Sequence, residues 1–318
     1  MFSGGWDSSI SNHYQSDSII SFDESIRGAY VRWVLSPQNA ISIAVVGGGF
    51  LFFTAWEMFA PLRRILEPKL RHVIRNLTVG GISLAIFTLL QGPVLVPVAD
   101  WARQHRVGLL NRVEIHAPLD TIVAILFLDY TLWWWHRANH QVPFLWRFHL
   151  PHHVDLDLDA STALRFHFGE LTLSIAYRSM QILLIGTSVF QLWIWQTILF
   201  ASILFHHSNA RIPLAFERVL VRVIVTPRMH GIHHSGRLNE TNSNWSSLLS
   251  VWDHVHRTMV LNVPQSEITI GVPAYEDPSE VTIGKVLLLP FGRQRRDFHL
   301  PDGSLSLRPH VNAEALPA

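Results

Sequence analysis

The chain has 318 residues, of which 48% are hydrophobic and only 15% are charged. Because an average soluble domain carries about 25% charged residues, this composition indicates a protein that lies in a membrane. The formal net charge of +1 is not that of a nucleic-acid-binding protein. No cysteine is present, which excludes disulfides, thiolate zinc sites, iron–sulfur clusters and cysteine nucleophiles from this sequence.

The first 38 residues are polar and rich in Ser and Asp. They contain no basic stretch followed by an apolar one, so we predict no cleavable signal peptide. Three apolar stretches follow, and each is near the roughly 20 residues that a helix needs to span a bilayer. They cover about residues 39–60, 74–99 and 117–135, and the second contains Gly92, Pro93 and Pro97.

A fourth apolar region covers residues 171–205, and its single charged residue is Arg178. It is too long for one spanning helix and suits two short helices joined by a tight turn at 186–188. We therefore predict a helical hairpin that enters and leaves the membrane on one side. A single long tilted helix followed by an interfacial segment is the alternative.

Basic residues predict the orientation, because cytoplasmic loops are enriched in Lys and Arg. Loop 61–76 holds five of them, segment 1–38 holds only Arg27 and Arg32, and loop 100–116 holds three. This distribution favours a cytoplasmic loop 61–76 and an outside N-terminus. The third span and the hairpin then both end in the cytoplasm, and Trp133-Trp134-Trp135 marks the membrane boundary there.

Histidine carries the chemical signal, since 13 of the 19 histidines lie between His136 and His256. Residues three or four apart share a face of a helix, and imidazole is a ligand for zinc, copper, iron and nickel. Eight such ligands exceed what one ion needs, so we predict two metal ions, with zinc and iron both open at this point. The eight form one HxxxH and two HxxHH motifs: His136 and His140; His149, His152 and His153; His230, His233 and His234.

Other histidines and nearby acids are assigned smaller roles. His207 is predicted as a ninth ligand because it ends the hairpin on the same face, whereas His167 and His206 stay open between ligand and structural roles. His254 and His256 are expected to be supporting or structural. The remaining histidines are expected to be structural or exposed: His13, His72, His105, His116, His299 and His310.

Acidic side chains near the motifs could orient the ligands by hydrogen bonds. Asp129 lies seven residues before His136 on the same helix face and could orient it. Asp159 and Asp253 could do the same for their neighbours. Asp155 and Asp157 are expected to be solvated loop charges.

These motifs, with apolar stretches before and between them, resemble the fatty acid hydroxylase and sterol desaturase superfamily. The resemblance covers about residues 119–260, with weaker similarity at Trp56-Glu57, and is strongest to bacterial sterol-desaturase-like and alkylglycerol-monooxygenase-like members. It departs from the family pattern at Phe168, where Pro is common, and at His254-Val255-His256-Arg257. Further segments support it: 159–165, 207–209, Thr226-Pro227 and 244–258.

The resemblance, together with the apolar stretches, implies an all-α integral membrane protein. We expect three spanning helices plus a helical hairpin, with a cytoplasmic helical cap that carries a His-rich dimetal site. The expected division is a polar N-terminal segment, two transmembrane helices with their loops, a catalytic domain and a C-terminal tail: 1–38, 39–116, 117–260 and 261–318.

The function implied by the resemblance is O2-dependent hydroxylation or desaturation of a lipid or sterol C–H bond. The eight motif histidines would be catalytic and, with His207, would bind two iron ions, zinc being the alternative metal as purified. Electrons would come from an external donor, since no dinucleotide-binding fingerprint is present, and the expected location is the bacterial inner membrane. A zinc-dependent lipid hydrolase and a His-rich metal transporter are the alternatives.

Overall fold

A computed structural model of the chain describes residues 36–309. The expectations for residues 1–35, for His13 and for His310 lie outside this range. The described residues divide between Ala44 and Val45 into two units. Within residues 36–309 the regular elements are helices, with isolated β-bridges and no β-strand, so the predicted all-α class is confirmed.

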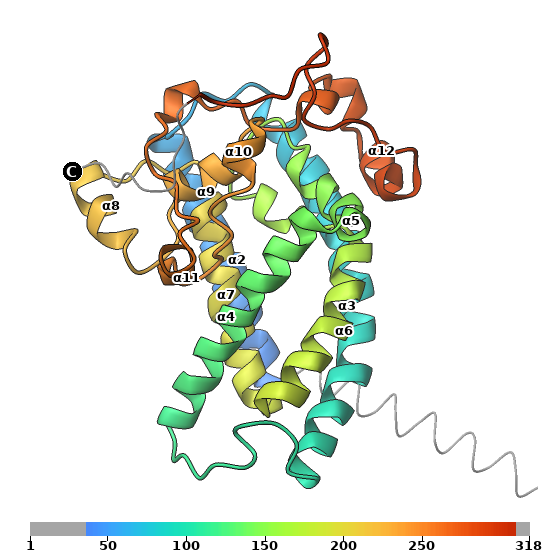
Figure 1. Cartoon of the computed structure of the whole chain (residues 1–318), viewed down its shortest axis with the longest axis vertical. Coiled ribbons are helices and arrows are strands. Elements are labelled where there is room, and N and C mark those ends of the chain that lie inside the picture. The colour runs from blue at the N-terminus through green and yellow to red at the C-terminus, as the bar shows by residue number, and fades with distance from the viewer. Residues whose placement is uncertain (1–35, 310–318) are drawn as a thin grey trace, which may run out of the picture. The chain divides into compact units, whose positions relative to one another are not determined.

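Five long helices dominate the described residues, and three of them are long and apolar enough to cross a membrane: α2, α3 and α7. Within the unit 45–318, α3, α4, α6 and α7 run beside one another (Figure 1). The three apolar helices and the hairpin are those of a membrane protein, as predicted. The five helices are α2 (Pro37–Phe59), α3 (Lys69–Gln104), α4 (Leu119–Gln141), α6 (Phe168–Ile185) and α7 (Val189–His207).

The third candidate span differs from the one expected. Residues 117–135 do form most of helix α4, but α7 and not α4 joins α2 and α3 as sufficiently apolar. Helix α4 carries Asp120 and Asp129 and ends with polar His136, Arg137 and His140. These polar groups lower the mean hydropathy of α4. Polar side chains in membrane helices face the protein interior rather than lipid.

The predicted hairpin is present as two separate helices, α6 and α7. Gly186 ends α6 in the left-handed conformation, with φ of +82°, which a residue without Cβ adopts at no steric cost. Ser188 then begins α7 with a reciprocal pair of hydrogen bonds to Gln191, the capping-box arrangement. The alternative of one long tilted helix is therefore wrong.

Helix α3 is longer than the expected span and packs closely against α6 and the segment before it. Pro93 and Pro97 lie inside the helix and do not end it; neighbouring helices can tolerate such breaks in membrane proteins. A Cβ on Gly80 would lie 2.3 Å from the backbone oxygen of Leu164. Gly80 thus permits the close approach that brings α3 against the chain just after the second histidine motif.

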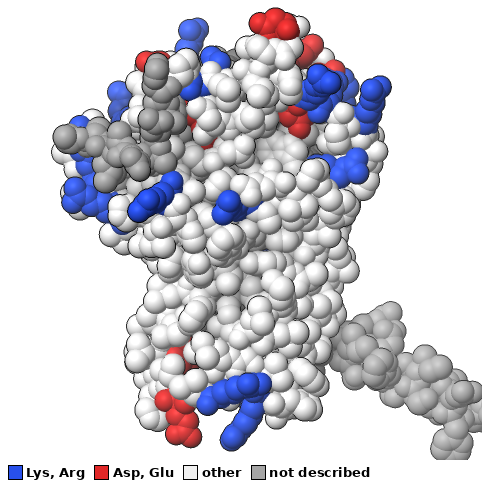
Figure 2. All heavy atoms as spheres, viewed as in Figure 1, with Lys and Arg blue, Asp and Glu red and all other residues white. Residues whose placement is uncertain are grey.

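Short helices and loops cover one end of the long helices within the unit 45–318 (Figure 1). This confirms a helical cap. Figure 2 shows a broad band of uncharged side chains on one face, with charged side chains gathered toward the two ends. The cap holds α5 (Pro143–His153), η1 (Thr162–Leu164), α8 (Leu214–Leu220), α9 (Pro227–His233), α10 (Leu238–Thr241), α11 (Val251–Val255), η2 (Gln265–Glu267), η3 (Pro273–Tyr275), η4 (Pro278–Glu280), α12 (Ile283–Leu288) and η5 (Leu289–Phe291).

Candidate metal centre

Four helices bring the predicted ligands to the capped end. His136 and His140 lie one turn apart at the end of α4, and His207 is the last residue of α7. The two HxxHH motifs end α5 and α9, which begin with Pro143 and Pro227. Proline suits the first turn of a helix because its missing N–H would have no hydrogen-bond partner there. Each proline therefore starts a helix whose histidine motif begins about one to two turns later.

The nine predicted ligands form two groups, within each of which the ring nitrogens lie within 4.8 Å of one another. The groups adjoin, since the rings of His153 and His234, one from each, stack with centroids 4.3 Å apart. The first group has five members and the second four: His136, His140, His149, His153 and His233; His152, His207, His230 and His234.

Ring nitrogens meet at short distances in the second group. The Nε2 atom of His207 lies 3.0 Å from Nε2 of His152 and 3.0 Å from Nε2 of His230. His234 Nε2 lies 3.1 Å from the same atom of His230. A neutral imidazole has one N–H and one lone pair, so these contacts cannot all be hydrogen bonds. Ligands about 2.1 Å from a shared ion lie roughly 3.0–3.4 Å from one another, so the donor set fits a metal ion.

The first group leaves buried lone pairs without a partner. Nε2 of His140 and Nε2 of His233 are buried and form no hydrogen bond, although buried polar atoms are usually paired. His149 Nε2 lies 3.2 Å from Nε2 of His153. Unsatisfied nitrogens that face a common centre indicate that a cation belongs there.

Backbone carbonyls orient three of the rings through their other nitrogen. Nδ1 of His136 lies 2.7 Å from the Trp245 carbonyl oxygen, that of His233 2.8 Å from Ser243 and that of His207 2.9 Å from Ile203. A carbonyl only accepts, so each Nδ1 carries the proton and Nε2 is left as the ligand atom.

Asp129 does not orient His136, contrary to prediction. Its Oδ2 accepts hydrogen bonds from the Leu249 backbone and from Trp252 Nε1. Seven residues of helix correspond to about 10 Å along its axis, which is too far for a direct contact. Asp253 acts on His136 indirectly. Its carboxylate accepts a hydrogen bond from the Trp245 backbone N–H, and the Trp245 carbonyl accepts one from His136.

Glu170 is a site residue that the sequence analysis did not identify. Its Oε1 lies 3.0 Å from Nδ1 of His149, and Asn139 Nδ2 donates to the same oxygen at 3.3 Å. A carboxylate behind a ligating imidazole fixes the ring and raises its basicity. Glu170 is the only acid in residues 168–205. A single acid in an apolar hairpin is the sequence feature that could have identified it as a site residue.

Burial favours the neutral form of five of these histidines. Desolvation, with repulsion from neighbouring imidazoles, holds the pKa values of His152, His153, His230 and His234 well below the usual range. Burial lowers the pKa of His233 to about 3. At neutral pH these rings therefore present free lone pairs, and protons do not compete with a metal ion.

The histidines left open or assigned supporting roles lie outside both groups. His167 caps α6, with Nδ1 accepting from Gly169 and Nε2 donating to the Leu287 carbonyl, so its role is structural. His206 is buried, and its ring lies 4.1 Å from that of His230. His254 is exposed, and His256 stacks on Trp133 at 4.0 Å.

The expectation that Asp155 and Asp157 are solvated is wrong, because both are buried. Asp155 Oδ1 lies 2.9 Å from His72 Nε2 and 2.8 Å from an Arg75 nitrogen. Burial raises the pKa of Asp155, but the stronger opposing charges of His72 and Arg165 hold it well below the usual range. Asp157 accepts from the backbone N–H of Glu67 at 2.8 Å.

This acid–base network ties the start of α3 to the turn after the second histidine motif. Asp159 Oδ2 contacts His72 Nδ1 at 2.8 Å and Lys69 Nζ at 2.7 Å. His72 is therefore structural, which is one of the two roles expected for it. Glu67, His72 and Asp155 also come within ligand distance of one another, but their polar atoms already pair with Arg75 and Asp159, so they hold the loop rather than an ion.

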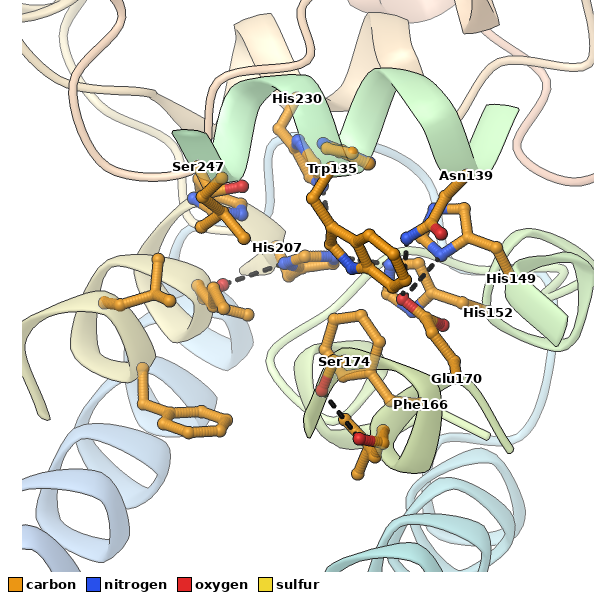
Figure 3. Close-up of a pocket in the computed structure, with 17 residues that line it drawn as sticks. Trp135, Asn139, His149, His152, Phe166, Glu170, Ser174, His207, His230 and Ser247 are labelled. Carbon is orange, nitrogen blue, oxygen red and sulfur yellow. Dashed lines mark hydrogen bonds and ion pairs between the residues drawn. The ribbon is translucent and has the colours of Figure 1, made fainter. Parts of the chain in front are cut away.

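A small cavity of about 80 Å³ borders the histidines between α4, α6 and α7. Polar atoms line one end, among them those of Glu170 and several of the histidines, as Figure 3 shows. Leu171, Leu199 and Ile203 line the side toward the membrane-spanning helices. The cavity therefore places apolar side chains directly beside the histidine groups.

Comparisons with known proteins identify the segment that holds the site. Residues 121–258 match the fatty acid hydroxylase family. The ornithine lipid hydroxylase OlsE of Rhizobium tropici is 31% identical over 155 residues, which cover 48% of this chain and 45% of that protein. Alkylglycerol monooxygenase of Homo sapiens is 28% identical over 142 residues, 45% of this chain and 31% of that protein.

The Xenopus tropicalis alkylglycerol monooxygenase is 28% identical over 179 residues, 54% of this chain and 38% of that protein. The chain thus spans less than half the length of the curated relatives that it matches. No solved structure matches it. Residues 121–258, which contain all nine predicted ligands, match the fatty acid hydroxylase family, and the predicted resemblance to the fatty acid hydroxylase and sterol desaturase superfamily is confirmed.

Proposed function

We propose that this chain is a membrane-bound di-iron oxygenase that hydroxylates a C–H bond of a lipid with O2. The observation that carries the proposal is the pair of adjacent histidine groups beside an apolar cavity between the long helices. The family match and the names of the relatives, a lipid hydroxylase and monooxygenases, support an oxidoreductase that acts on lipids.

Each histidine group would hold one iron ion. An all-imidazole set accepts zinc as well as iron, and the hydroxylase and monooxygenase names of the relatives favour iron. When bound, the ions supply the activation of O2 and the oxidising power for C–H cleavage. The predicted ligand set is proposed unchanged: His136, His140, His149, His152, His153, His207, His230, His233 and His234.

The protein's own residues would bind the chain and shape the site. The lipid would enter from the bilayer between the helices, and its target carbon would lie in the cavity beside Leu199 and Ile203. Glu170 would hold His149 in the orientation that its lone pair needs. The apolar side chains that line the cavity would limit the access of water to the reacting carbon.

The balanced reaction needs two electrons from outside the chain. R–H, O2, two protons and two electrons give R–OH and water; the same oxidant taking two hydrogens would give an alkene and two waters. The names of the relatives favour the alcohol. The sequence has no cysteine for an iron–sulfur cluster, so we infer a separate electron-transfer protein or small reductant.

The location is also a proposal. Arg63, Arg64, Lys69, Arg71 and Arg75 follow α2 on the side that carries the histidines. Because basic loops stay in the cytoplasm, this distribution favours a cytoplasmic histidine site in the bacterial inner membrane.

Metal content and lipid products test the proposal together. The full chain, purified from membranes, is expected to bind about two irons, and cells that express it should gain lipids with one added oxygen only in air. His152→Ala and His233→Ala, one from each group, should lose iron and product, whereas the exposed control His254→Ala should lose neither. Stoichiometric zinc, with lipid turnover that is unaffected by anaerobiosis, would favour a hydrolase and contradict the proposal.

A further inference from the structure

Helix α8 begins where two candidate membrane-spanning helices end. Helix α2 ends at Phe59 and α7 at His207, and the chains that follow them meet at a β-bridge between Pro61 and Ala210. The Arg211 backbone N–H then donates to the Ala60 carbonyl at 2.8 Å. Helix α8 starts three residues later, at the level where a bilayer around α2 and α7 would end.

Apolar side chains in and beside α8 are exposed although the segment is short. Leu214 is 50% exposed, Phe216 61%, Val219 62% and Val223 58%. Phe216, Val219 and Val223 follow one another at steps of three and four residues, so they share one side of the segment. An apolar side at the membrane boundary suits contact with acyl chains.

The same segment carries an excess of positive charge. Residues 211–228 contain four arginines and one acid, Glu217. Glu217 pairs with Arg228, whose Nε lies 2.6 Å from its carboxylate. Among the described residues, no ion pair joins Arg211, Arg218 or Arg222 to a carboxylate, and all three are exposed. Figure 2 shows positive side chains on the side where Figure 1 places α8.

A pocket of about 550 Å³ separates α8 from the segment 261–265. Its lining includes three arginines, one acid and two amides: Arg218, Arg222 and Arg228; Glu217, which pairs with Arg228; Asn262 and Gln265. Leu214, Val221 and Leu261 add an apolar side. Such a mixture of cationic, amide and apolar groups fits a phosphate that is attached to a hydrocarbon.

A further cation lies behind the pocket wall. Arg63 is buried, and its Nη1 donates to Gln265 Oε1 at 2.8 Å and to the Pro227 carbonyl at 3.1 Å. Its Nε and Nη2 have no hydrogen-bond partner. Among the described residues no ion pair joins Arg63 to a carboxylate, although Glu57 and Glu217 lie near enough to offset part of its charge.

We propose that α8 and the segment 261–265 bind the headgroup of an anionic phospholipid from the surrounding bilayer. The phosphate would lie between Arg218 and Arg222, and the upper acyl chains would lie along Phe216 and Val219. The site is separate from the histidine groups, and it would fix the height and tilt of the cap on a membrane rather than take part in oxidation.

Thermal unfolding of the full chain in a non-ionic detergent tests this site. Phosphatidylglycerol is expected to raise the unfolding temperature by at least about 3 °C, and phosphatidylcholine at the same mole ratio should leave it unchanged. The double variant Arg218→Gln/Arg222→Gln should lose this shift, with a half-saturating lipid concentration at least tenfold higher. Arg293→Gln/Arg296→Gln is the matched control, because it removes two exposed arginines elsewhere in the cap and should keep the full shift.

Two results would overturn the assignment. An undiminished phosphatidylglycerol shift in Arg218→Gln/Arg222→Gln would show that the lipid binds elsewhere, and an equal shift from inorganic phosphate alone would replace the lipid by a free anion. Helicity and the lipid-free unfolding temperature of the double variant establish that it is folded. These readouts do not depend on iron or O2, so they are independent of the proposed oxygenase activity.

Discussion

Replacing Glu170 should weaken one of the two proposed metal sites and spare the other. Glu170 contacts only His149 among the predicted ligands, with Oε1 3.0 Å from Nδ1, and His149 belongs to the five-histidine group. Loss of a carboxylate behind a ligating imidazole typically weakens metal binding by about 10–100-fold, which corresponds to roughly 1.4–2.8 kcal/mol. The loss of metal affinity should be near 100-fold for Glu170→Ala and near 10-fold for Glu170→Gln, because the amide oxygen of Gln can still accept a hydrogen bond.

The assay is competition between the iron-loaded protein and a chelator, followed as iron retained per chain. Glu170→Ala should release one ion at a chelator concentration about 10–100-fold lower than the wild-type protein does and the other at the unchanged one. Glu276→Ala, which removes an exposed acid, is the control. Equal weakening of both ions, or of neither, would refute the assignment of Glu170 to one group.

Three further predictions concern stability. Gly80→Ala should destabilise the protein by about 1–3 kcal/mol, seen as a lower unfolding temperature, because the new Cβ would meet the Leu164 backbone oxygen; an unchanged temperature would mean that α3 does not pack there. Asp155→Asn should cost about 3–5 kcal/mol, since it leaves the charges of Arg75 and His72 buried with less compensation, and denaturant unfolding measures this loss. The metal-free protein should lose stability as pH falls below about 6.5. Below that pH the unfolded chain binds a proton at His233, whereas the folded protein does not, because burial lowers the pKa of His233 to about 3. Each such histidine reduces the free energy of unfolding by about 1.4 kcal/mol per pH unit. Equal unfolding temperatures at pH 7.5 and 5.5 would contradict this.

Local spacing explains which parts of the site could be predicted. The ligand motifs and the hairpin turn depend on residues within four positions of one another, and helical geometry determines how those lie. The grouping of the eight motif histidines therefore follows from the sequence, as does the break at Gly186.

Partners distant in sequence could not be predicted. The Trp245 carbonyl that orients His136 lies 109 residues away, and the His72 ring that meets Asp155 lies 83 residues away. Nothing in the neighbourhood of Asp155 indicates burial, because its sequence context of alternating Asp and Leu resembles an exposed loop. Only the fold supplies the opposite charges that make this burial affordable.

The two HxxHH motifs are used in a reciprocal way that explains why two groups form side by side. In the first motif His149 and His153 enter the five-histidine group and His152 the other; in the second, His230 and His234 enter the four-histidine group and His233 the other. Side chains four apart share a helix face, while the adjacent residue points about 100° away. Each pair of adjacent histidines therefore contributes one residue to each group. The helical turn that supplies one group also places a histidine in the other.

The HxxxH motif then makes the groups unequal. His136 and His140 both join the first group, whereas α7 contributes only His207 to the second. Three of the four members of the second group line the cavity, against two of the five members of the first. With fewer protein ligands and more contact with the cavity, the second group is where we expect a coordination position for O2 or substrate. His207→Ala should accordingly abolish product formation while the first site keeps its iron, and loss of both ions together would contradict this division.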